Sequence, residues 1–403
     1  MKPIFIALLA ATIGCTCVDL ASADEPARFT EKIIWSFGSG TDGRAPAAGL
    51  TRVNGTLYST TEGGGTSSHG TVFAFDLATG AEKIVYSFCS HQNCSDGDFP
   101  LAGLVDVRGT LYGTTVLGGG GTPAAGTAFA LDLNTGTEKV LHSFCSQQNC
   151  ADGRNPQASP IDVNGRLYGT AYADTVFELN RRTGAEKVLY SFCRKANCAD
   201  GAGLPAGVID VGGMLYGTTS EGGNIDGCNE MGCGVVFSVD PNTGGETVLH
   251  TFGSGADGAT PLAGLIDVNG TLFGTTSAGG NTNNGTVFSV DPNTGSEKVV
   301  YAFAGGADGA HPYAGLIAVN GTLYGTTYVG GGGSCTNAGP GCGTVYSVNP
   351  TTGAEQVLYA FQGGTDGAIP QAGLLAVNGS LYGTTSEGGT YRNGTVFVLK
   401  KRR

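Results

Sequence analysis

The sequence is poor in charged and aromatic residues, and it contains one tryptophan, three methionines and five histidines among 403 residues. Only 13% of the residues are charged, and acidic residues outnumber basic ones 33 to 21, which gives a net charge of −12. A nucleic-acid-binding protein needs a basic face, so we predict no nucleic-acid partner. Apart from residues 4–13, which are too few to cross a bilayer, the chain has no long apolar run, so we predict no membrane span.

Motifs for catalysis and metal binding are also missing. The sequence has no His-x-His or Glu-x-x-His pair of the kind that holds a metal, no serine nucleophile elbow, and no glycine-rich loop that opens a helix and binds phosphate. We therefore predict no metal site and no cofactor. Whether the protein is an enzyme stays open at this point, and the composition favours a function without catalysis.

The N-terminus has the features of a secretory signal peptide. Lys2 precedes the apolar segment 4–13, and the small residues 21–23 form a cleavage site. We predict a signal peptide at 1–23, a linker at 24–30, and a secreted protein of the periplasm or the cell exterior. Lipidation of Cys15 is the alternative, although the residues before it fit a lipoprotein cleavage site poorly.

Ten of the twelve cysteines remain after this cleavage, and they form five local pairs. An even number in an exported chain predicts disulfides, whereas the alternative, zinc, would have to bring two distant pairs together in a tetrahedral site. Closing so short a loop contributes roughly 2 kcal/mol, so such bonds stiffen loops and do not replace a core. The predicted pairs are Cys89/Cys94, Cys145/Cys150, Cys193/Cys198, Cys228/Cys233 and Cys335/Cys342.

One phrase, Leu-Tyr-Gly-Thr-Thr or a close variant, occurs seven times. The spacings are 54, 56, 48, 57, 51 and 58 residues, which indicates a repeat architecture. The copies begin at Leu57, Leu111, Leu167, Leu215, Leu272, Leu323 and Leu381.

Each repeat contains four apolar blocks of strand length, as residues 260–303 illustrate. Asn-Gly joins the first two blocks, which suits a tight hairpin, and Pro-Asn-Thr-Gly or a variant joins the last two. Four antiparallel strands repeated seven times predict an all-β, seven-bladed β-propeller.

The two ends of the chain are out of phase with the repeat. Residues 31–37 resemble a lone fourth strand, and 394–400 form a third strand without its fourth. We predict that these segments pair and close the ring, because pairing removes two bare sheet edges. The predicted blades cover 45–88, 99–144, 155–192, 204–252, 260–303, 311–361 and 369–400 plus 31–37, and 401–403 form a basic tail.

The phrases Leu-Tyr-Gly-Thr-Thr-x-x-Gly-Gly, Gly-Thr-Val-Phe-Ser-Val-Asp-Pro-Asn-Thr-Gly and Glu-Lys-Val-Leu-Tyr-Ser-Phe resemble the Gloeo/Verruco tandem repeats of secreted bacterial proteins. The resemblance covers about residues 31–400 and implies export and a propeller-like fold. It implies no activity. Many members of this family carry a C-terminal surface-sorting segment, but the resemblance found in this chain does not include such a segment.

The two faces of the predicted ring differ. One face, the turn face, carries the short turns. The other face, the loop face, carries the variable links between second and third strands and between successive blades. All five cysteine pairs also lie on the loop face. Asp-Gly recurs on the loop face in all seven repeats and is interpreted as a turn, with a carboxylate ring for a cation as the alternative. Residues that break the repeat are better candidates for binding, and on this face they are His91, His311, His69, Tyr328 and Tyr391.

Two functions remain possible from the sequence. The first, which we favour, is a monomeric binding or interaction module that holds a glycan or a protein on the loop face. The alternative is a lyase or hydrolase at the mouth of the central channel, a hypothesis that rests on analogy with other propellers. The third blade has the shortest loop, at 172–174, which predicts a notch in the rim of that face.

Overall fold

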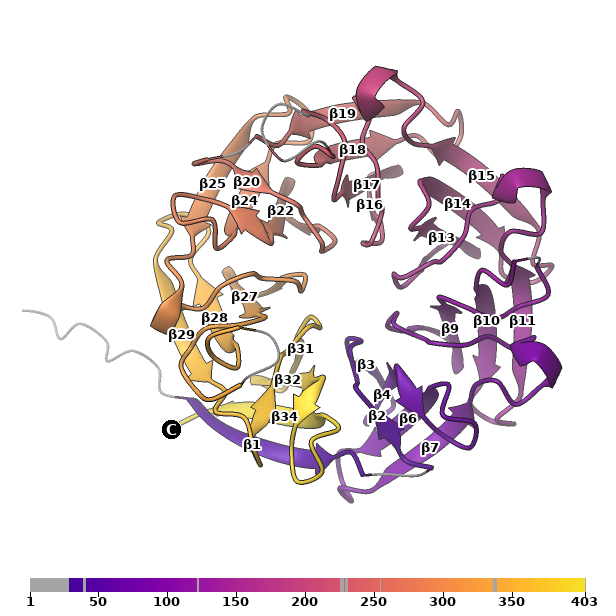
Figure 1. The fold of residues 1–403 in the computed structure, drawn as a ribbon, viewed down its shortest axis with the longest axis horizontal. Coiled ribbons are helices and arrows are strands. Elements are labelled where there is room, and N and C mark those ends of the chain that lie inside the picture. Colours follow the sequence, from indigo (N-terminus) through magenta and orange to yellow (C-terminus); the bar gives the residue numbers. More distant parts are fainter. Residues whose placement is uncertain are drawn as a thin grey trace, which may run out of the picture.

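The computed structural model describes residues 29–38, 41–121, 123–224, 228, 231–253, 255–335 and 339–402. The predicted signal peptide and Cys15 lie outside these residues. Seven four-stranded antiparallel sheets are arranged as blades around a central opening (Figure 1). The prediction of a seven-bladed propeller is therefore confirmed. Among the described residues, no helix has the length and apolar character needed to cross a membrane.

The first four blades follow one another along the chain. Blade 1 has β3 (Thr51–Val53), β4 (Thr56–Thr61), β6 (Thr71–Asp76) and β7 (Glu82–Ser87). Blade 2 has β8 (Val105–Val107), β9 (Thr110–Thr115), β10 (Thr127–Asp132) and β11 (Glu138–Ser143). Blade 3 has β12 (Ile161–Val163), β13 (Arg166–Ala171), β14 (Thr175–Asn180) and β15 (Glu186–Ser191). Blade 4 has β16 (Ile209–Val211), β17 (Met214–Thr219), β18 (Val235–Val239) and β19 (Glu246–Thr251).

The last three blades complete the ring. Blade 5 has β21 (Ile266–Val268), β22 (Thr271–Thr276), β24 (Thr286–Val290) and β25 (Glu297–Ala302). Blade 6 has β26 (Ile317–Val319), β27 (Thr322–Thr327), β28 (Thr344–Val348) and β29 (Glu355–Ala360). Blade 7 combines β31 (Leu375–Val377), β32 (Ser380–Thr385) and β34 (Thr395–Lys401) with the N-terminal strand β1 (Phe29–Ser36).

The pairing of β1 with β34 closes the ring, as predicted. It is antiparallel and runs from Phe29 opposite Lys401 to Ser36 opposite Thr395. In Figure 1 the indigo N-terminal strand lies along the outer edge of the yellow C-terminal blade. The two ends of the described chain therefore protect each other's edges, which would otherwise be exposed.

The structure explains the repeated Leu-Tyr-Gly-Thr-Thr phrase residue by residue. Its leucines are buried in the cores between blades. A Cβ at the central glycine, for example Gly274, would lie 2.5 Å from the ring of Phe288 on the next strand, so only glycine fits in this repeat. The first threonine bonds the next blade: Thr218 donates to the Ala263 carbonyl oxygen at 3.0 Å. The phrase is thus a packing unit and not a binding motif.

Each of the seven cores lies between two blades. The phenylalanine that ends each fourth strand packs against an aromatic ring of the next blade's third strand, as Phe252 does with Phe288 at a centroid distance of 5.0 Å. The ring is continuous, since Phe361 packs on Phe397 of blade 7 and Phe37, directly after β1, packs on Phe73 of blade 1. Aromatic pairs of this kind add specific geometry to the burial of apolar area.

Candidate functional site

The links between blades carry short extra ladders on the loop face, which the sequence analysis did not predict. They pair β2 (Gly43–Arg44) with β5 (Gly63–Gly64), β20 (Gly258–Ala259) with β23 (Ala278–Gly279), and β30 (Gly367–Ala368) with β33 (Glu387–Gly388). Isolated bridges stand at the same place in blades 2, 4 and 6. Each ladder pairs the segment that leads into a blade with the loop that follows the second strand of the same blade. The loop face therefore has a rigid base.

The recurrent Asp-Gly aspartates hold the links between blades. Asp96 accepts hydrogen bonds from the Tyr86 hydroxyl at 2.8 Å and from the Ser90 amide at 2.9 Å. The same position, Asp308, accepts from the Tyr301 hydroxyl at 2.8 Å. Burial favours a higher pKa for Asp96, but these hydrogen bonds outweigh it and lower the pKa. The contacts support the interpretation of Asp-Gly as a turn.

The third residue after each of these aspartates has the same unusual backbone in every blade. Its φ is positive, between 51° and 66°, a region that glycine tolerates and other residues seldom adopt. The amide and carbonyl of this residue bridge neighbouring loops; for example, the Phe99 amide donates to the His69 carbonyl oxygen and its carbonyl accepts from the Val116 amide. Seven different residue types occupy the position: Ala45, Phe99, Asn155, Gly203, Thr260, His311 and Ile369. The same backbone frame thus carries a different residue in each blade, although Gly203 has no side chain and Ile369 is buried in a core.

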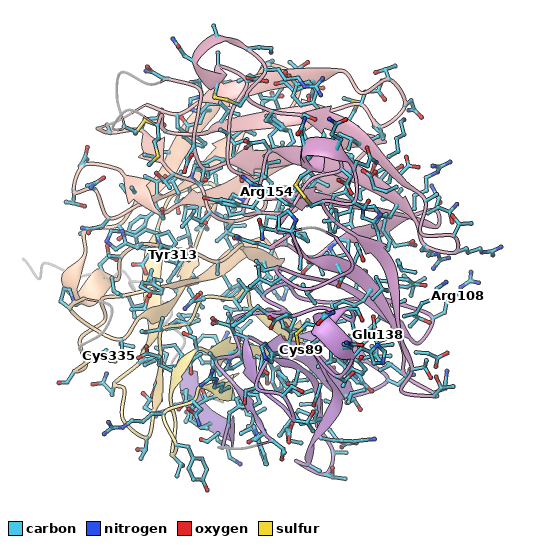
Figure 2. All side chains as sticks on the ribbon, turned by 45° about the vertical axis from the view of Figure 1, so that its right-hand side comes forward. Cys89, Arg108, Glu138, Arg154, Tyr313 and Cys335 are labelled. Carbon is cyan, nitrogen blue, oxygen red and sulfur yellow. A yellow bond between two sulfur atoms is a disulfide. The ribbon has the colours of Figure 1, made fainter. Side chains whose placement is uncertain are left out.

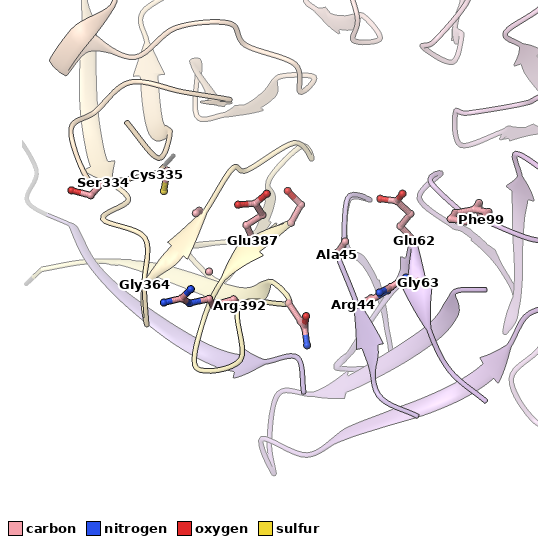
Figure 3. Close-up of a pocket in the computed structure, with 14 residues that line it drawn as sticks. Arg44, Ala45, Glu62, Gly63, Phe99, Ser334, Cys335, Gly364, Glu387 and Arg392 are labelled. Carbon is pink, nitrogen blue, oxygen red and sulfur yellow. The ribbon is translucent and has the colours of Figure 1, made fainter. Parts of the chain in front are cut away.

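A groove of about 600 Å³ crosses the loop face of blade 7 and reaches its neighbours on both sides. In Figure 3, Glu387 and Arg392 belong to blade 7, while Arg44 and Glu62 belong to blade 1. Ser334 of blade 6 and Phe99 of the link to blade 2 mark its ends. The groove therefore extends across three blade boundaries.

The charged side chains of this groove make no ion pair with one another. Among the described residues, no nitrogen of Arg44 or Arg392 lies within 4.0 Å of a carboxylate, and the carboxylates of Glu62 and Glu387 accept no hydrogen bond. Arg44 lies across the backbone of Gly63, where a side chain would collide with it. Two donors and two acceptors are therefore unused in one groove.

The predicted histidines do not gather in one site. The His69 Nδ1 atom lies 2.8 Å from the Asp98 carboxylate, and its ring meets Phe99 edge to face. His91 directly precedes the short helix η1 (Gln92–Cys94), and its side chain makes no capping hydrogen bond. His311 donates from Nδ1 to the Ser277 carbonyl oxygen at 2.7 Å. His69 lies in the loop before β6 within blade 1, His91 in the link from blade 1 to blade 2, and His311 in the link from blade 5 to blade 6.

The predicted tyrosines lie nearer the groove. Tyr328 stacks on Tyr313 with a centroid distance of 4.4 Å, and burial together with neighbouring Tyr313 and Glu387 raises its pKa. Tyr391 is 60% exposed and, with Trp35 and Asp42, lines a second hollow beside the groove. Tyrosine and tryptophan faces of this kind suit flat apolar surfaces with polar edges, such as sugar rings.

The short loop of blade 3 borders a hollow of about 420 Å³ at the position of the predicted notch. Tyr172, Asp174 and Glu221 line it, together with Arg154, which Figure 2 labels. The Asp174 carboxylate accepts a hydrogen bond from the Gly203 amide at 2.6 Å and so ties blade 3 to blade 4. This hollow is smaller than the groove over blade 7.

Seven glutamates, at or near the start of each fourth strand, approach the aspartates of the preceding blade near the outer rim. Figure 2 labels one of them, Glu138, and Cys89, which opens the disulfide loop of the preceding blade. Burial, reinforced by the neighbouring aspartate, raises the pKa of Glu138 to about 8, and it raises to about 7 the pKa of Glu31, Glu82, Glu186, Glu297 and Glu355. Glu246 instead pairs with Lys195 at 2.9 Å. The sequence alone does not predict these clusters, because their members belong to different blades.

All five predicted disulfides are formed. Three close loops around η1, η2 (Gln148–Cys150) and η3 (Ala196–Cys198), while a fourth short helix, η4 (Gly306–Asp308), stands at the same place without cysteines. Cys89 and Cys94 also lie near His69, but a disulfide sulfur is not available as a thiolate ligand. The five bonds indicate that the protein matures in an oxidising compartment such as the periplasm or the cell exterior.

Two of the ten cysteines reach from their loops into the cores between blades, which the sequence did not predict. Cys233 and Cys342 are fully buried, with 0% of their surface exposed, and they belong to the hydrophobic cores between blades 4 and 5 and between blades 6 and 7. The reason is their place in the chain, since each lies two residues before a third strand, where the backbone has already entered the blade. Their partners, Cys228 and Cys335, are only partly buried. These two bonds therefore anchor a loop to the core, and neither Cys233 nor Cys342 is accessible to a ligand.

The sequence pattern of the Gloeobacter/Verrucomicrobia repeat matches residues 25–175 and 174–339. The chain belongs to this repeat family. The match confirms the resemblance found in the repeated phrases, and the family, like the fold, is typical of a general interaction module. No curated protein matches the chain in sequence.

Several solved structures resemble this member of the repeat family at low sequence identity. The extracellular domain of the putative hybrid two component system BT4673 from B. thetaiotaomicron matches with a TM-score of 0.57 and 11% identity; the match covers 92% of this chain and 39% of that one. BamB from Moraxella catarrhalis gives 0.49 and 14%, covering 92% and 98%, and the computationally designed Ika8 protein gives 0.48 and 15%, covering 89% and 98%. The first of these likenesses supports the fold and carries no function.

Proposed function

We propose that the protein is an exported binding module that holds a glycan in the groove over blade 7. The observation that carries the proposal is the set of four unpaired charged groups, Arg44, Glu62, Glu387 and Arg392, around one groove. Guanidinium donors and carboxylate acceptors are the partners that sugar hydroxyls need, and each would form a charge-assisted hydrogen bond.

The shape of the groove favours an extended ligand. It spans residues from Ser334 of blade 6 to Phe99 beyond blade 1, and Tyr391 stands exposed beside it. A chain of sugar units could lie along such a groove, with donors and acceptors alternating along the path and aromatic faces near its ends. Because the four charges sum to zero, a neutral oligosaccharide fits better than a highly charged one.

Binding and not catalysis is the better supported function. His91 directly precedes the short helix η1, and the Nδ1 atom of His311 donates a hydrogen bond to the Ser277 backbone carbonyl oxygen. Among the described residues, neither imidazole ring has a nitrogen within 4.0 Å of a carboxylate oxygen, so neither has the acid–base partner that a lyase or hydrolase would use.

The repeat supplies substitutions that test the proposal with little risk to folding. Other blades have alanine in place of Arg44 and Glu387, serine in place of Glu62, and asparagine in place of Arg392, at Ala259, Ala278, Ser277 and Asn283. We expect each of the variants R44A, E62S, E387A and R392N to weaken oligosaccharide binding about tenfold. A change of this size corresponds to the loss of roughly one charged hydrogen bond.

The measurement is calorimetric titration of the mature protein with neutral oligosaccharides found in an initial thermal-shift screen. Arg108→Asn, which restores the Asn-Gly turn of other blades on the turn face, is the control and should bind normally. If oligosaccharides bind equally well to all four groove variants, the site lies elsewhere. Binding of a protein partner in place of every glycan would contradict the ligand class.

A further inference from the structure

A second candidate site, independent of the groove, lies near the outer rim between blades 4 and 5. His250 of β19, Asp257 of the following link and Glu297 of β25 offer one ligand atom each, and the three atoms lie within 4.8 Å of one another. The His250 Nε2 atom is 3.3 Å from the Asp257 carboxylate oxygen. We propose that these three residues bind a zinc ion.

The chemistry of the three side chains matches zinc. Imidazole nitrogen and carboxylate oxygen are common zinc ligands, with bonds of about 2.0–2.2 Å, and sites with three protein ligands complete a tetrahedron with water. In such a tetrahedron neighbouring ligand atoms lie about 3.3 Å apart. The His250–Asp257 contact already has this separation, so only the Glu297 carboxylate has to move inward. Calcium is a poorer fit because it prefers six or more oxygen ligands.

The environment leaves the three groups available to an ion. The Glu297 Oε1 atom is buried and has no hydrogen-bond partner among the described residues. The side chains of His250 and Asp257 are 20% and 25% exposed, so an ion can enter from solvent. Asp257 also accepts hydrogen bonds from the Gly253 and Gly258 amides, which hold its carboxylate in place.

Comparison with the other blades shows what makes this seam different. Four blades have tyrosine at the His250 position, namely Tyr86, Tyr190, Tyr301 and Tyr359, and the neutral phenol is a poor zinc ligand. Blade 2 has His142, but Asp152 is fully buried there and accepts from Ser146 and Gln147, and Glu186 does not complete a group of three. Blade 4 has a histidine at this position and also a short link that leads to a partly exposed aspartate. A zinc ion there would bind β19 to β25 across the seam.

The test is titration of the EDTA-treated, disulfide-intact mature protein with zinc chloride by calorimetry. We expect one equivalent of zinc to bind and the melting temperature to rise with it. His250→Tyr, which installs the residue of four other blades, should weaken zinc binding at least tenfold while keeping the fold, and Glu297→Gln should weaken it similarly. His142→Tyr is the matched control and should bind as the wild type does. The proposal is wrong if the wild type binds no zinc, or if His250→Tyr binds it with unchanged affinity.

Discussion

Blade 7 and the other six blades reach the same four-stranded sheet by different routes. In the six, a tight turn joins the third strand to the fourth, and the side chain that begins the turn accepts backbone hydrogen bonds within it, as Asp291 does from Asn293 and Thr294. Blade 7 has no such turn, because its fourth strand is β1 from the other end of the chain.

The missing turn is offset by a longer pairing. Seven residues of β1 have partners on β34, whereas five pairs join the third and fourth strands of blade 5. Arg402 adds a hydrogen bond from its Nε atom to the Thr30 hydroxyl. The ring therefore depends on strand pairing and on packing between blades, and the covalent turn is dispensable at one place.

Blade 7 also lacks one polar contact of the other blades. The single tryptophan, Trp35, stands where they have tyrosine or histidine, and its buried Nε1 atom has no hydrogen-bond partner among the described residues. Among the described residues, Asp42 accordingly accepts hydrogen bonds from the Gly38 and Gly43 amides alone. Blade 7 thus has a longer pairing between its third and fourth strands than blade 5 and fewer polar contacts than the other blades. It also carries the groove.

Removing β1 should have the largest effect. A chain that starts at Gly38 loses the fourth strand of blade 7 and exposes the edge of β34, so we expect loss of the cooperative fold or aggregation. Circular dichroism and thermal unfolding measure this. A chain that starts at Phe29 keeps β1 and is the control. A well-folded, monomeric chain from Gly38 would show that the ring does not need closure.

The second prediction compares equivalent aromatic residues. Phe37→Ala at the end of β1 and Phe252→Ala at the end of β19 each remove a fully buried ring, which costs about 3–5 kcal/mol. We expect the two losses to agree within about 1 kcal/mol, because both rings have the same contact with the next blade. Denaturant unfolding gives both values. A clearly smaller loss for Phe37→Ala would mean that β1 is held less firmly than a covalently joined strand.

The third prediction concerns pH. Burial raises the pKa of Glu31 in β1 and of Glu82 in β7 to about 7 from an ordinary value of 4.5, so between these values the folded state binds more protons than the unfolded state. The free energy of unfolding should therefore fall as the pH rises from 5 to 8. Burial lowers the pKa of His142, which acts in the opposite direction, but this is one histidine against six glutamates with raised pKa values.

The size of this effect is on the order of 1 kcal/mol per glutamate, since solvent screens half-exposed groups. E31Q and E82Q should each flatten the pH dependence by the same amount if the closing blade resembles the others. Denaturant unfolding of the wild type and both variants at pH 5 and pH 8 decides the point. A stability that increases from pH 5 to pH 8 would contradict the assignment.

The smallest expected difference concerns the threonine bonds between blades. Thr218→Val removes a hydrogen bond to the Ala263 carbonyl and should cost about 1 kcal/mol. Thr384→Val should cost less, because its acceptor, the Ala48 carbonyl, also receives a hydrogen bond from the Ser59 hydroxyl. If the two variants lose the same stability in thermal unfolding, the Ser59 hydroxyl does not compensate for the missing threonine donor.

Much of the fold could be predicted because the repeat exposes it. Seven copies of one phrase fix the number of blades, and the out-of-phase segments 31–37 and 394–400 indicate the closure. The pairs of cysteines were also recognisable, since each pair lies within one link. The burial of Cys233 and Cys342 was not, because it depends on how the neighbouring blade packs against them.

The candidate sites could be predicted only in part. Sequence reasoning selected the loop face and Tyr391 beside the groove, but it gave no reason to group Arg44 with Arg392, which are 348 residues apart (392 − 44). It also predicted no metal site, because His250, Asp257 and Glu297 belong to no short motif. Residues that meet across a blade boundary leave no local pattern.

By itself, the sequence determined the all-β repeat, its seven copies, the strand order within each blade and the local disulfides, because these depend on contacts within or between adjacent repeats. Only the tertiary structure decided which loop side chains meet where the ring brings the two ends of the chain together. That closure places the loops of blade 7 and blade 1 side by side, and it creates the groove with its four unpaired charges. The physical reason is that a closed ring makes neighbours of residues that are most distant along the chain.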